Sequence, residues 1–319
     1  MGSHLVEVAL ARGYDVWAAI RQSSSRQWLQ DSRINFIILS LNNAEQLRCE
    51  ISDFAANHGG RGWDYVVHAA GATKAVSEEA FMRANYEATQ NLAATLVVLG
   101  LQPRRFVLMS SLSAVPMKNG HPAGKKAPTA YGRSKLKAED CVKAMLPQMD
   151  SVILRPTGVY GPREKDYFLM AKSIRRHMDF AVGFKPQQIT FIYVKDLCEA
   201  TLLALANGPS GATYQLSDGR TYSSRDFSRL LQWAMGVRRV VHVTAPLWLL
   251  CTVCHAGQWW SNLTHRMIAI NKDKYHILKQ RDWRCDISKA VADLGYEADY
   301  DLERGVAETV AWYKEHKWI

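Results

Sequence analysis

The sequence lacks a long uninterrupted hydrophobic run. Its longest apolar stretch, VTAPLWLLCTVCHAGQWW, contains a proline, a histidine and a glutamine and is short for a bilayer span. The first residues also lack the basic segment, apolar segment and small-residue cleavage site of a secretory signal. We therefore expect a cytoplasmic protein with no integral membrane span, while the apolar stretch leaves contact with a membrane surface or an apolar ligand open.

Cysteine is scarce, with six unevenly spaced residues in 319. Without an export signal this usage predicts free thiols rather than a disulfide framework. Cys251, Cys254 and His255 match the C-x-x-C-H pattern of c-type haem attachment, but they lie in an apolar helical stretch. No second cysteine pair has the spacing of a zinc site. We interpret the match as chance in a buried helix and predict no metal.

Acidic residues are fewer than basic ones, 30 against 40, for a formal net charge of +10. The basic residues are spread along the chain, and neither zinc-finger spacing nor a helix-turn-helix pattern accompanies them. This distribution predicts a basic solvated surface and no nucleic-acid partner. With 48% hydrophobic and 22% charged residues, the chain can bury a full core and is unlike a disordered protein.

What is present is a regular alternation of apolar strand patterns with helical patterns of ten or more residues. This alternation predicts a doubly wound α/β fold with a parallel sheet covered on both faces. Beyond Tyr160 it loosens, and residues 238–285 are aromatic and irregular. We predict a nucleotide-binding domain over residues 1–160, to which 189–216 return, and a smaller C-terminal substrate lobe over 161–188 and 217–319.

The pattern with the clearest chemistry is Tyr131 and Lys135, one helical turn apart. A lysine ammonium near a phenol favours the phenolate, so this pair predicts a lowered tyrosine pKa and proton exchange with a substrate oxygen. Two other Y-x-x-x-K matches exist, but only Tyr131 follows a strand that ends in serines. We expect Ser111 or Ser113 to contact the same substrate oxygen; strand-end capping is the alternative for the serines, and a surface pair for Tyr131 and Lys135.

Five segments occur in the order found in one family: DYVVHAAGATKA, RANYEATQNL, FVLMSSLSAV, AYGRSKLKAED and VILRPTGVYGPRE. Over residues 2 to about 235 the chain resembles the extended short-chain dehydrogenases/reductases, the NAD-dependent epimerase/dehydratase family. The resemblance implies a Rossmann-type fold, a nicotinamide cofactor and a small-molecule substrate. It implies catalytic positions for Ser111, Tyr131 and Lys135, a supporting role for Asn85, cofactor contacts for Ala69, Ala70, Gly71, Lys135 and Pro156, and a bend into the substrate lobe at Arg155 and Pro156.

In this family the first strand leads into a T-G-x-x-G-x-x-G loop whose glycines let the backbone approach the pyrophosphate at a helix N-terminus. The segment MGSHLVE resembles the second half of that loop and the start of its helix, with Gly2 as the last glycine. The first strand and two glycines are then missing, and each buried backbone group left unpaired costs on the order of 1–3 kcal/mol. We therefore expect Met1 to be an internal methionine, which an in-frame upstream strand would verify and an upstream stop codon would refute.

Cofactor choice is indicated by the end of the second expected strand. An acidic residue there accepts hydrogen bonds from the adenosine ribose, whereas this chain has Arg21, Ser24 and Arg26 in a donor-rich turn. The pattern favours NADP, with NAD as the alternative, and a merely solvated Arg21 as the interpretation without function. An acid that often follows the third strand near the adenine is replaced by Ser40.

For the substrate, the segment ITFIYVKD has Ile189 and Thr190 where nucleotide-sugar members carry an arginine, which helps hold the diphosphate, and an aspartate. The lobe instead offers several tryptophans, either as an apolar lining or as ordinary core: Trp233, Trp248, Trp259 and Trp260. We predict an NADP-dependent oxidoreductase acting on a ketone or alcohol, resembling the dihydroflavonol reductase and 3β-hydroxysteroid dehydrogenase branches. A nucleotide-sugar epimerase or dehydratase and an inactive nucleotide-binding remnant are the alternatives. A homodimer through a pair of long helices, common in the family, is left open.

Overall fold

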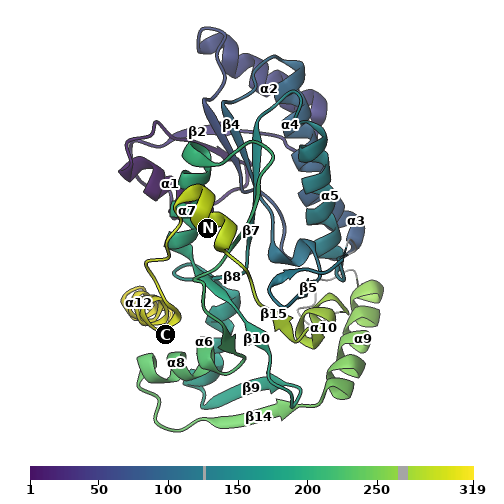
Figure 1. Cartoon of the computed structure of the whole chain (residues 1–319), viewed down its shortest axis with the longest axis vertical. Coiled ribbons are helices and arrows are strands. Elements are labelled where there is room, and N and C mark those ends of the chain that lie inside the picture. Colours follow the sequence, from purple (N-terminus) through teal and green to yellow (C-terminus); the bar gives the residue numbers. More distant parts are fainter. Residues whose placement is uncertain (125–126, 265–271) are drawn as a thin grey trace.

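The main parallel sheet consists of β3 (Tyr65–His68), β4 (Arg105–Met109), β7 (Ser151–Pro156) and β12 (Thr213–Leu216), in the order β12-β7-β4-β3 (Figure 1). The computed structural model describes residues 1–124, 127–264 and 272–319, without the side chains of residues 256, 258–264 and 272–274. A separate parallel pair is formed by β1 (Trp17–Ile20) and β2 (Asn35–Ile38). The predicted α/β architecture is therefore confirmed, with its parallel strands divided between two sheets.

Helices cover both faces of the main sheet. The helices within the described residues are α1 (Gly2–Ala11), α2 (Ala44–Asn57), α3 (Glu78–Phe81), α4 (Ala88–Val98), α5 (Ala130–Ala144), α6 (Asp166–Arg175), α7 (Val194–Asn207), α8 (Asp226–Met235), α9 (Leu247–Thr264), α10 (Lys272–Lys279), α11 (Ser288–Leu294) and α12 (Leu302–Glu315), with a π-helical segment η1 (Met82–Glu87) and a 3-10 turn η2 (Leu112–Ala114). Between β1 and β2, residues 21–34 form successive turns and no regular helix.

The core follows the alternation of side chains along β4. Phe106 and Leu108 pack on one face against α2, α4 and α5, while Val107 and Met109 pack on the other against α1 and α7. All residues of β7 are buried, as expected for an inner strand of a parallel sheet covered on both sides. This arrangement brings the carboxyl ends of β3, β4 and β7 to one edge of the sheet.

The C-terminal lobe is built from short strands around an aromatic core. Two short strands come from the loop after Ser111: β5 (Met117–Lys118) and β6 (His121–Pro122). The other strands of this region are β8 (Gly158–Tyr160), β9 (Met178–Val182), β10 (Gln188–Ile189), β11 (Phe191–Tyr193), β13 (Tyr222–Ser223), β14 (Val241–Ala245) and β15 (Asp282–Trp283). Tyr160, Phe191 and Phe227 meet in the core between α6, α8 and α12. The chain returns from the lobe to pair β12 with β7; the domain limits themselves stay a prediction.

Candidate active site

Ser111 lies just beyond the carboxyl end of β4 and connects two parts of the site. Its hydroxyl accepts a hydrogen bond of 3.2 Å from the backbone N–H of Ser113 and so caps η2. The same side chain is hydrogen-bonded to the phenol of Tyr131. Ser111 therefore both caps η2 and interacts with Tyr131. The bond to Ser113 orients the Ser111 hydroxyl, which faces the phenol.

Tyr131 reaches Ser111 because α5 begins close to the segment after β4. Thr129 caps the helix by accepting the N–H of Gly132 at 2.9 Å. A Cβ on Gly132 would lie 2.2 Å from the carbonyl oxygen of Ser113, so only glycine allows this close approach. The glycine directly after the tyrosine thus positions the phenol at the strand end.

Lys135 lies one turn further along α5 and is buried. Its Nζ donates a 2.9 Å hydrogen bond to the carbonyl oxygen of Met109, the last residue of β4. Burial lowers the pKa of Lys135 to about 8, and the nearby carboxylate of Glu139 opposes this shift. The ammonium therefore titrates close to the physiological range.

The pKa of Tyr131 is raised, because burial disfavours the phenolate more than the hydrogen bond from Ser111 favours it. The sequence predicted a pKa lowered toward neutrality by Lys135, and that prediction is wrong for the described structure. The physical reason is geometric: the ammonium is bound to the carbonyl of Met109, and desolvation dominates at the phenol. The phenol of Tyr131 is therefore protonated at neutral pH in this arrangement.

Asn85 joins the loop after β3 to α5. It lies buried in η1, a π-helical segment of the kind often found at functional sites. Its amide oxygen accepts the N–H of Ala72 at 2.8 Å, and its Nδ2 donates to the carbonyl of Ala72 at 3.0 Å and to Ser134 at 2.9 Å. A Cβ on Gly71 would lie 2.6 Å from this amide oxygen and 3.2 Å from Nζ of Lys135. Gly71, which follows Ala69 and Ala70, is therefore held beside the lysine.

A buried ion pair that the sequence reasoning missed lies one helical turn beyond Lys135, between Glu139 of α5 and Arg155 of β7. Glu139, with no exposed surface, accepts from Nε and Nη2 of Arg155 at 2.8 and 2.5 Å and from the hydroxyl of Ser110 at 2.5 Å. Glu139 follows Lys135 by one helical turn, and Arg155 stands in an otherwise apolar strand. An acid on the buried face of α5 and a cation inside β7 are the signals that point to this pair. Pro156, directly after Arg155, is buried at the end of β7.

His68, the last residue of β3, is another buried group that the sequence reasoning did not single out. Burial, together with the charge of Lys135, lowers the pKa of its imidazole to about 3. The ring is therefore neutral, and its Nε2 lacks a hydrogen-bond partner in the part of the chain that the structure describes.

The N-terminus of α1 fits an anionic group. No side chain caps this helix end, and its first turn holds no acidic residue. Gly2 has open space around the position where a Cβ would be. The exposed N–H groups and the positive end of the helix dipole suit a phosphate there. The proposed place of Gly2 against a nicotinamide dinucleotide is thus compatible with the residues present.

The turn after β1 presents the residues expected to distinguish NADP from NAD. Arg21 is exposed, and its backbone N–H donates to the hydroxyl of Ser24 at 3.1 Å. Arg26 instead stacks on the ring of Phe36 in β2, with its guanidinium carbon 4.3 Å from the ring centroid. At the end of β2, Glu50 of α2 accepts from both the N–H and the hydroxyl of Ser40, at 2.6 and 2.7 Å. Tertiary packing therefore brings a carboxylate to the position where the sequence has a serine.

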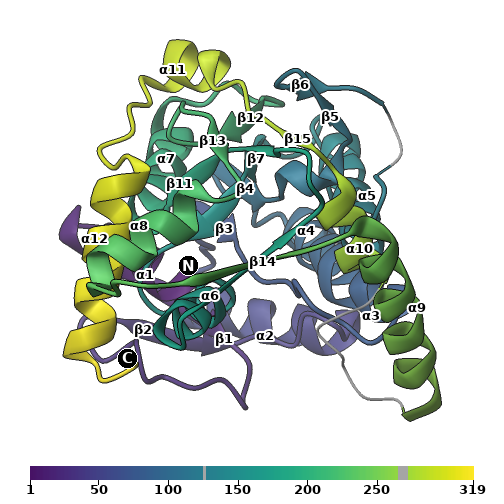
Figure 2. The ribbon, with the colours of Figure 1, turned by 90° about the horizontal axis from the view of Figure 1, so that it is seen from below.

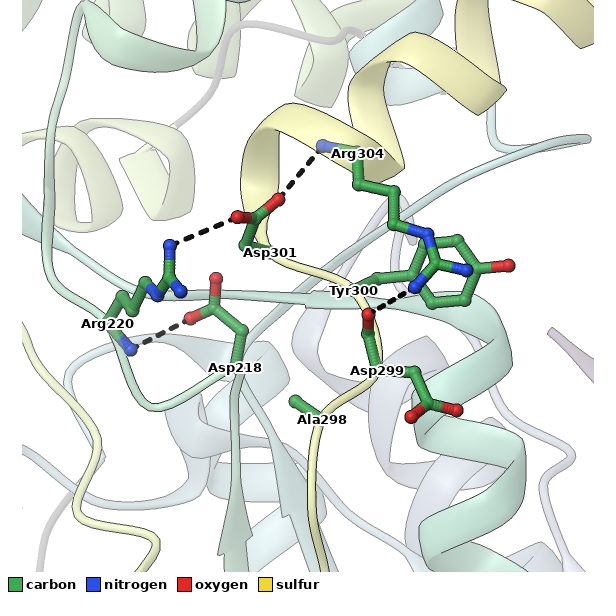
Figure 3. Close-up of a pocket in the computed structure, with 7 residues that line it drawn as sticks. All are labelled: Asp218, Arg220, Ala298, Asp299, Tyr300, Asp301 and Arg304. Atoms are coloured by element: carbon green, nitrogen blue, oxygen red, sulfur yellow. Dashed lines mark hydrogen bonds and ion pairs between the residues drawn. The ribbon is translucent and has the colours of Figure 1, made fainter.

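Two pockets lie apart from this cluster. One has a cavity volume of about 200 Å³ in the C-terminal lobe, where the guanidinium of Arg220 pairs with Asp301 and the backbone N–H of Arg304 donates to the same carboxylate (Figure 3). The guanidinium of Arg304 instead donates to the backbone carbonyl of Asp299. The other pocket has a volume of about 480 Å³. Lys74, from the loop after β3, lines this pocket and pairs with Asp166 of α6. Its apolar wall consists of Phe168, Leu169 and Trp318.

The remaining sequence candidates lie elsewhere. Trp233 and Trp248 are 67% and 68% exposed, so neither is core, and the side chains of Trp259 and Trp260 lie outside the described part of the chain. Cys254 is buried in α9 whereas His255 is exposed, and Nδ1 of His255 lies 2.8 Å from the carbonyl oxygen of Cys251. In the ranges the structure covers, no helix combines the length and apolarity needed to cross a membrane.

Comparison with known families identifies this arrangement. The model of the NAD dependent epimerase/dehydratase family matches residues 1–217. The chain belongs to this family. Its relatives include a ceramide reductase of Caulobacter vibrioides, 25% identical over all of this chain and 93% of the relative. A 4-hydroxy-2-methyl-3-oxo-4-farnesyl-3,4-dihydroquinoline-1-oxide ketoreductase of Stigmatella aurantiaca is 26% identical over 96% of this chain and 91% of its own length.

Solved structures of the family share the fold. The dTDP-glucose 4,6-dehydratase of Streptomyces venezuelae, crystallised with NAD, superposes with a TM-score of 0.76 at 22% identity, covering 99% of this chain and 94% of that one. The predicted family, Rossmann-type fold and enzymatic nature are thus confirmed, as is the use of a nicotinamide cofactor. The family's reductases also support the oxidoreductase interpretation.

Proposed function

We propose that this protein is an NADP-dependent reductase of an apolar ketone, with Tyr131 as its proton donor. The observation that carries the proposal is the placement of Tyr131 beside Ser111 at the carboxyl end of β4, which the close approach of Gly132 to Ser113 fixes. Lys135 lies one turn away, and its ammonium is held by the carbonyl of Met109. Two hydroxyl groups and one cation therefore converge where substrates of doubly wound sheets bind.

The proposed reaction turns a carbonyl into an alcohol. A reduced nicotinamide, for which Gly2, Gly71 and Lys135 are the expected contacts, would supply the hydride for the carbonyl carbon when bound. Tyr131 gives its hydroxyl proton to the carbonyl oxygen, and Ser111 donates a hydrogen bond to the same oxygen as negative charge develops there. Lys135, held by the carbonyl of Met109, keeps a positive charge one helical turn from Tyr131, and a solvent proton restores the phenol. Asn85 holds Gly71 and its neighbours beside the lysine.

An apolar substrate is supported by the residues that replace the diphosphate contacts of nucleotide-sugar enzymes. Thr190 is buried, and its hydroxyl bonds with Thr157 at 2.9 Å and donates to the carbonyl of Trp283 at 2.8 Å. Ile189 pairs with Trp283 in a small sheet and carries no charge. The two relatives named above are reductases whose substrate names include a ceramide and a farnesyl group.

The test is consumption of NADPH by the purified chain with a panel of long-chain or polycyclic ketones and of nucleotide sugars. Turnover of the ketones supports the proposal. Turnover of a nucleotide sugar without net consumption of cofactor, read by sugar chromatography, would instead favour an epimerase or dehydratase, the activity of the Streptomyces venezuelae neighbour.

The pH profile of ketone reduction should follow Lys135. Because its pKa is lowered to about 8 and that of Tyr131 is raised, both groups are protonated at neutral pH. We expect kcat/KM to be constant below about pH 8 and to fall as the ammonium loses its proton at higher pH. Lys135→Arg, which stays charged, should move the falling limb upward. An unchanged limb in this variant would assign the titration to another group.

Cofactor preference should depend on Arg21. Arg21→Ala is expected to raise the KM for NADPH on the order of tenfold, because a charge-assisted contact to the 2′-phosphate is lost. The KM for NADH should stay within about twofold, since NADH has no such phosphate. Arg48→Ala, an exposed arginine on α2, is the matched control. Equal effects on both cofactors would show that Arg21 does not read the phosphate.

A dimer through the contacting helices α4 and α5 and a cytoplasmic location remain predictions.

A further inference from the structure

Exposed apolar side chains cover one face of the parallel ribbon formed by β9 and β14. Val241 lies opposite Met178 and Val243 opposite Phe180 in the register of the two strands. These residues alternate with others along each strand, so all four project from the same face. Their exposed fractions are 37% for Met178, 58% for Phe180, 63% for Val241 and 36% for Val243. Such a concentration of exposed apolar groups on one face marks an interaction surface.

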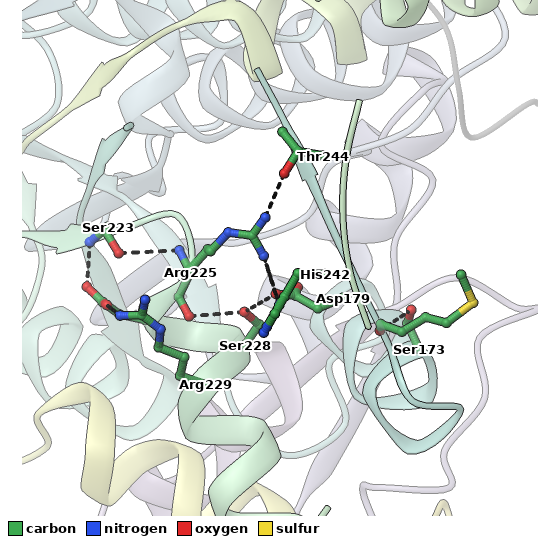
Figure 4. A network of polar contacts seen from close by, with 10 residues as sticks. Ser173, Asp179, Ser223, Arg225, Ser228, Arg229, His242 and Thr244 are labelled. Carbon is green, nitrogen blue, oxygen red and sulfur yellow. Dashed lines mark hydrogen bonds and ion pairs between the residues drawn. The ribbon is translucent and has the colours of Figure 1, made fainter. Parts of the chain in front are cut away.

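The opposite face of the ribbon is fastened to the lobe. Asp179, which alternates with the apolar residues, is buried and accepts from Arg225 at 2.7 Å and from Ser228 at 3.1 Å (Figure 4). Nδ1 of His242 lies 2.9 Å from the same carboxylate, and Arg225 also donates to Thr244 at 2.7 Å. This network links both strands to α8, so the ribbon is held in place with its apolar face toward solvent.

The ribbon lies at the end of the molecule opposite α2, and a view from that end shows β14 in front (Figures 1 and 2). The two strands end side by side, since the N–H of Gly183 bonds to the carbonyl of Ala245. Exposed aromatic residues follow both strands at this end. Phe184, just after β9, is 79% exposed, and Trp248, just after β14, is 68% exposed. The four ribbon residues together with Phe184 and Trp248 are called the apolar end surface below.

Basic residues gather at the other end of the same ribbon. Arg175 and Arg176 precede β9, Arg238 and Arg239 precede β14, and all four are exposed. Because the strands are parallel, the two arginine pairs meet at one edge, where His177 bonds to the backbone of Arg239. The segment 227–272, which supplies β14 and α9, contains no aspartate or glutamate. The apolar groups are thus flanked by four exposed arginines, none of which forms an ion pair with an acidic residue in the described part of the chain.

We propose that the apolar end surface docks on an anionic phospholipid bilayer, with the four arginines on lipid headgroups. Apolar and aromatic side chains bordered by cations are the combination that binds at a membrane interface. A second copy of this chain is a poorer occupant, because the contact would add the positive charge of both copies with no acidic residue from segment 227–272 to offset it. The surface is distinct from the cluster around Tyr131, so the proposal stands independently of the proposed reaction.

Flotation of the full-length protein with lipid vesicles tests this assignment. We expect binding to phosphatidylcholine vesicles containing about a third phosphatidylglycerol, at least tenfold weaker binding to pure phosphatidylcholine, and weakening with added salt. Phe180→Ser with Val243→Ser should abolish flotation, and Arg176→Ala with Arg239→Ala should weaken it about fivefold per arginine. Val98→Ser and Arg48→Ala, exposed residues of α4 and α2, are the matched controls and should float like the unmodified protein.

Circular dichroism checks that each variant is folded. Because the substituted positions are exposed, we expect all variants to fold. The proposal is overturned if the unmodified protein binds neither vesicle type, if it binds both equally, or if the serine variants float unchanged. A dimer in analytical ultracentrifugation that Phe180→Ser dissociates, without vesicle binding, would also overturn it and assign the surface to contact between copies.

Discussion

Tyr131→Phe is expected to lower kcat/KM for ketone reduction by about 10²- to 10⁴-fold, the range typical of losing a positioned proton donor. The variant keeps the ring and its packing near Phe81 but removes the hydroxyl that bonds to Ser111. Cofactor binding, followed by nicotinamide fluorescence, should change little, because the ring itself remains. The measurement is initial-rate kinetics with NADPH and the best ketone from the panel.

Tyr275→Phe is the matched control for this substitution. Tyr275 belongs to another Y-x-x-x-K match, in α10, where the ammonium of Lys279 lies 5.7 Å from its ring centroid. It should retain full activity. If Tyr131→Phe kept most of its activity, the proton would have to come from another group and the proposed mechanism would fail.

Glu139→Ala is expected to lower the free energy of unfolding by about 3–5 kcal/mol, the effect of removing one partner from a buried ion pair. The guanidinium of Arg155 and the hydroxyl of Ser110 would lose their acceptor in a site without solvent. Chemical denaturation followed by circular dichroism measures the change. Asp140→Ala, an exposed neighbour on α5, should alter stability by less than about 0.5 kcal/mol.

The double variant Glu139→Leu with Arg155→Met separates the charge from the packing. Since it leaves no uncompensated charge, it should be more stable than Glu139→Ala, although it changes the same two positions. A double variant that is no more stable than Glu139→Ala would contradict the assignment of the effect to the unpaired guanidinium. Because Glu139 also opposes the downward pKa shift of Lys135, Glu139→Gln should move the falling limb of the pH profile to lower pH.

Several features of the site could be predicted because they depend on short spacings. Tyr131 and Lys135 share a helix face by the period of the helix alone, and Ser111 follows a strand whose apolar pattern is unmistakable. Parallel strands bring such ends to one edge. The tyrosine pKa could not be predicted in the same way, since its sign depends on how much water the phenol loses and on where the ammonium finds its partner.

Contacts between segments that are distant in the chain could not be predicted from the sequence pattern. Glu139 meets Arg155 because α5 packs on β7, and Glu50 reaches Ser40 because α2 folds back on the end of β2. Likewise, an aromatic residue such as Trp233 or Trp248 looks the same in sequence whether it is buried or exposed. Only the packing of α8 and α9 left these two side chains at the surface.

By itself the amino-acid sequence determined the family, the α/β architecture and the residues that carry the proposed chemistry, because these are written in periodicities and motifs of a few residues. The tertiary structure alone decided the ion pair behind Lys135, the protonation of Tyr131 and the apolar end surface. Each of these depends on which distant segments exclude water from one another, and burial is a property of the packed chain rather than of any local pattern.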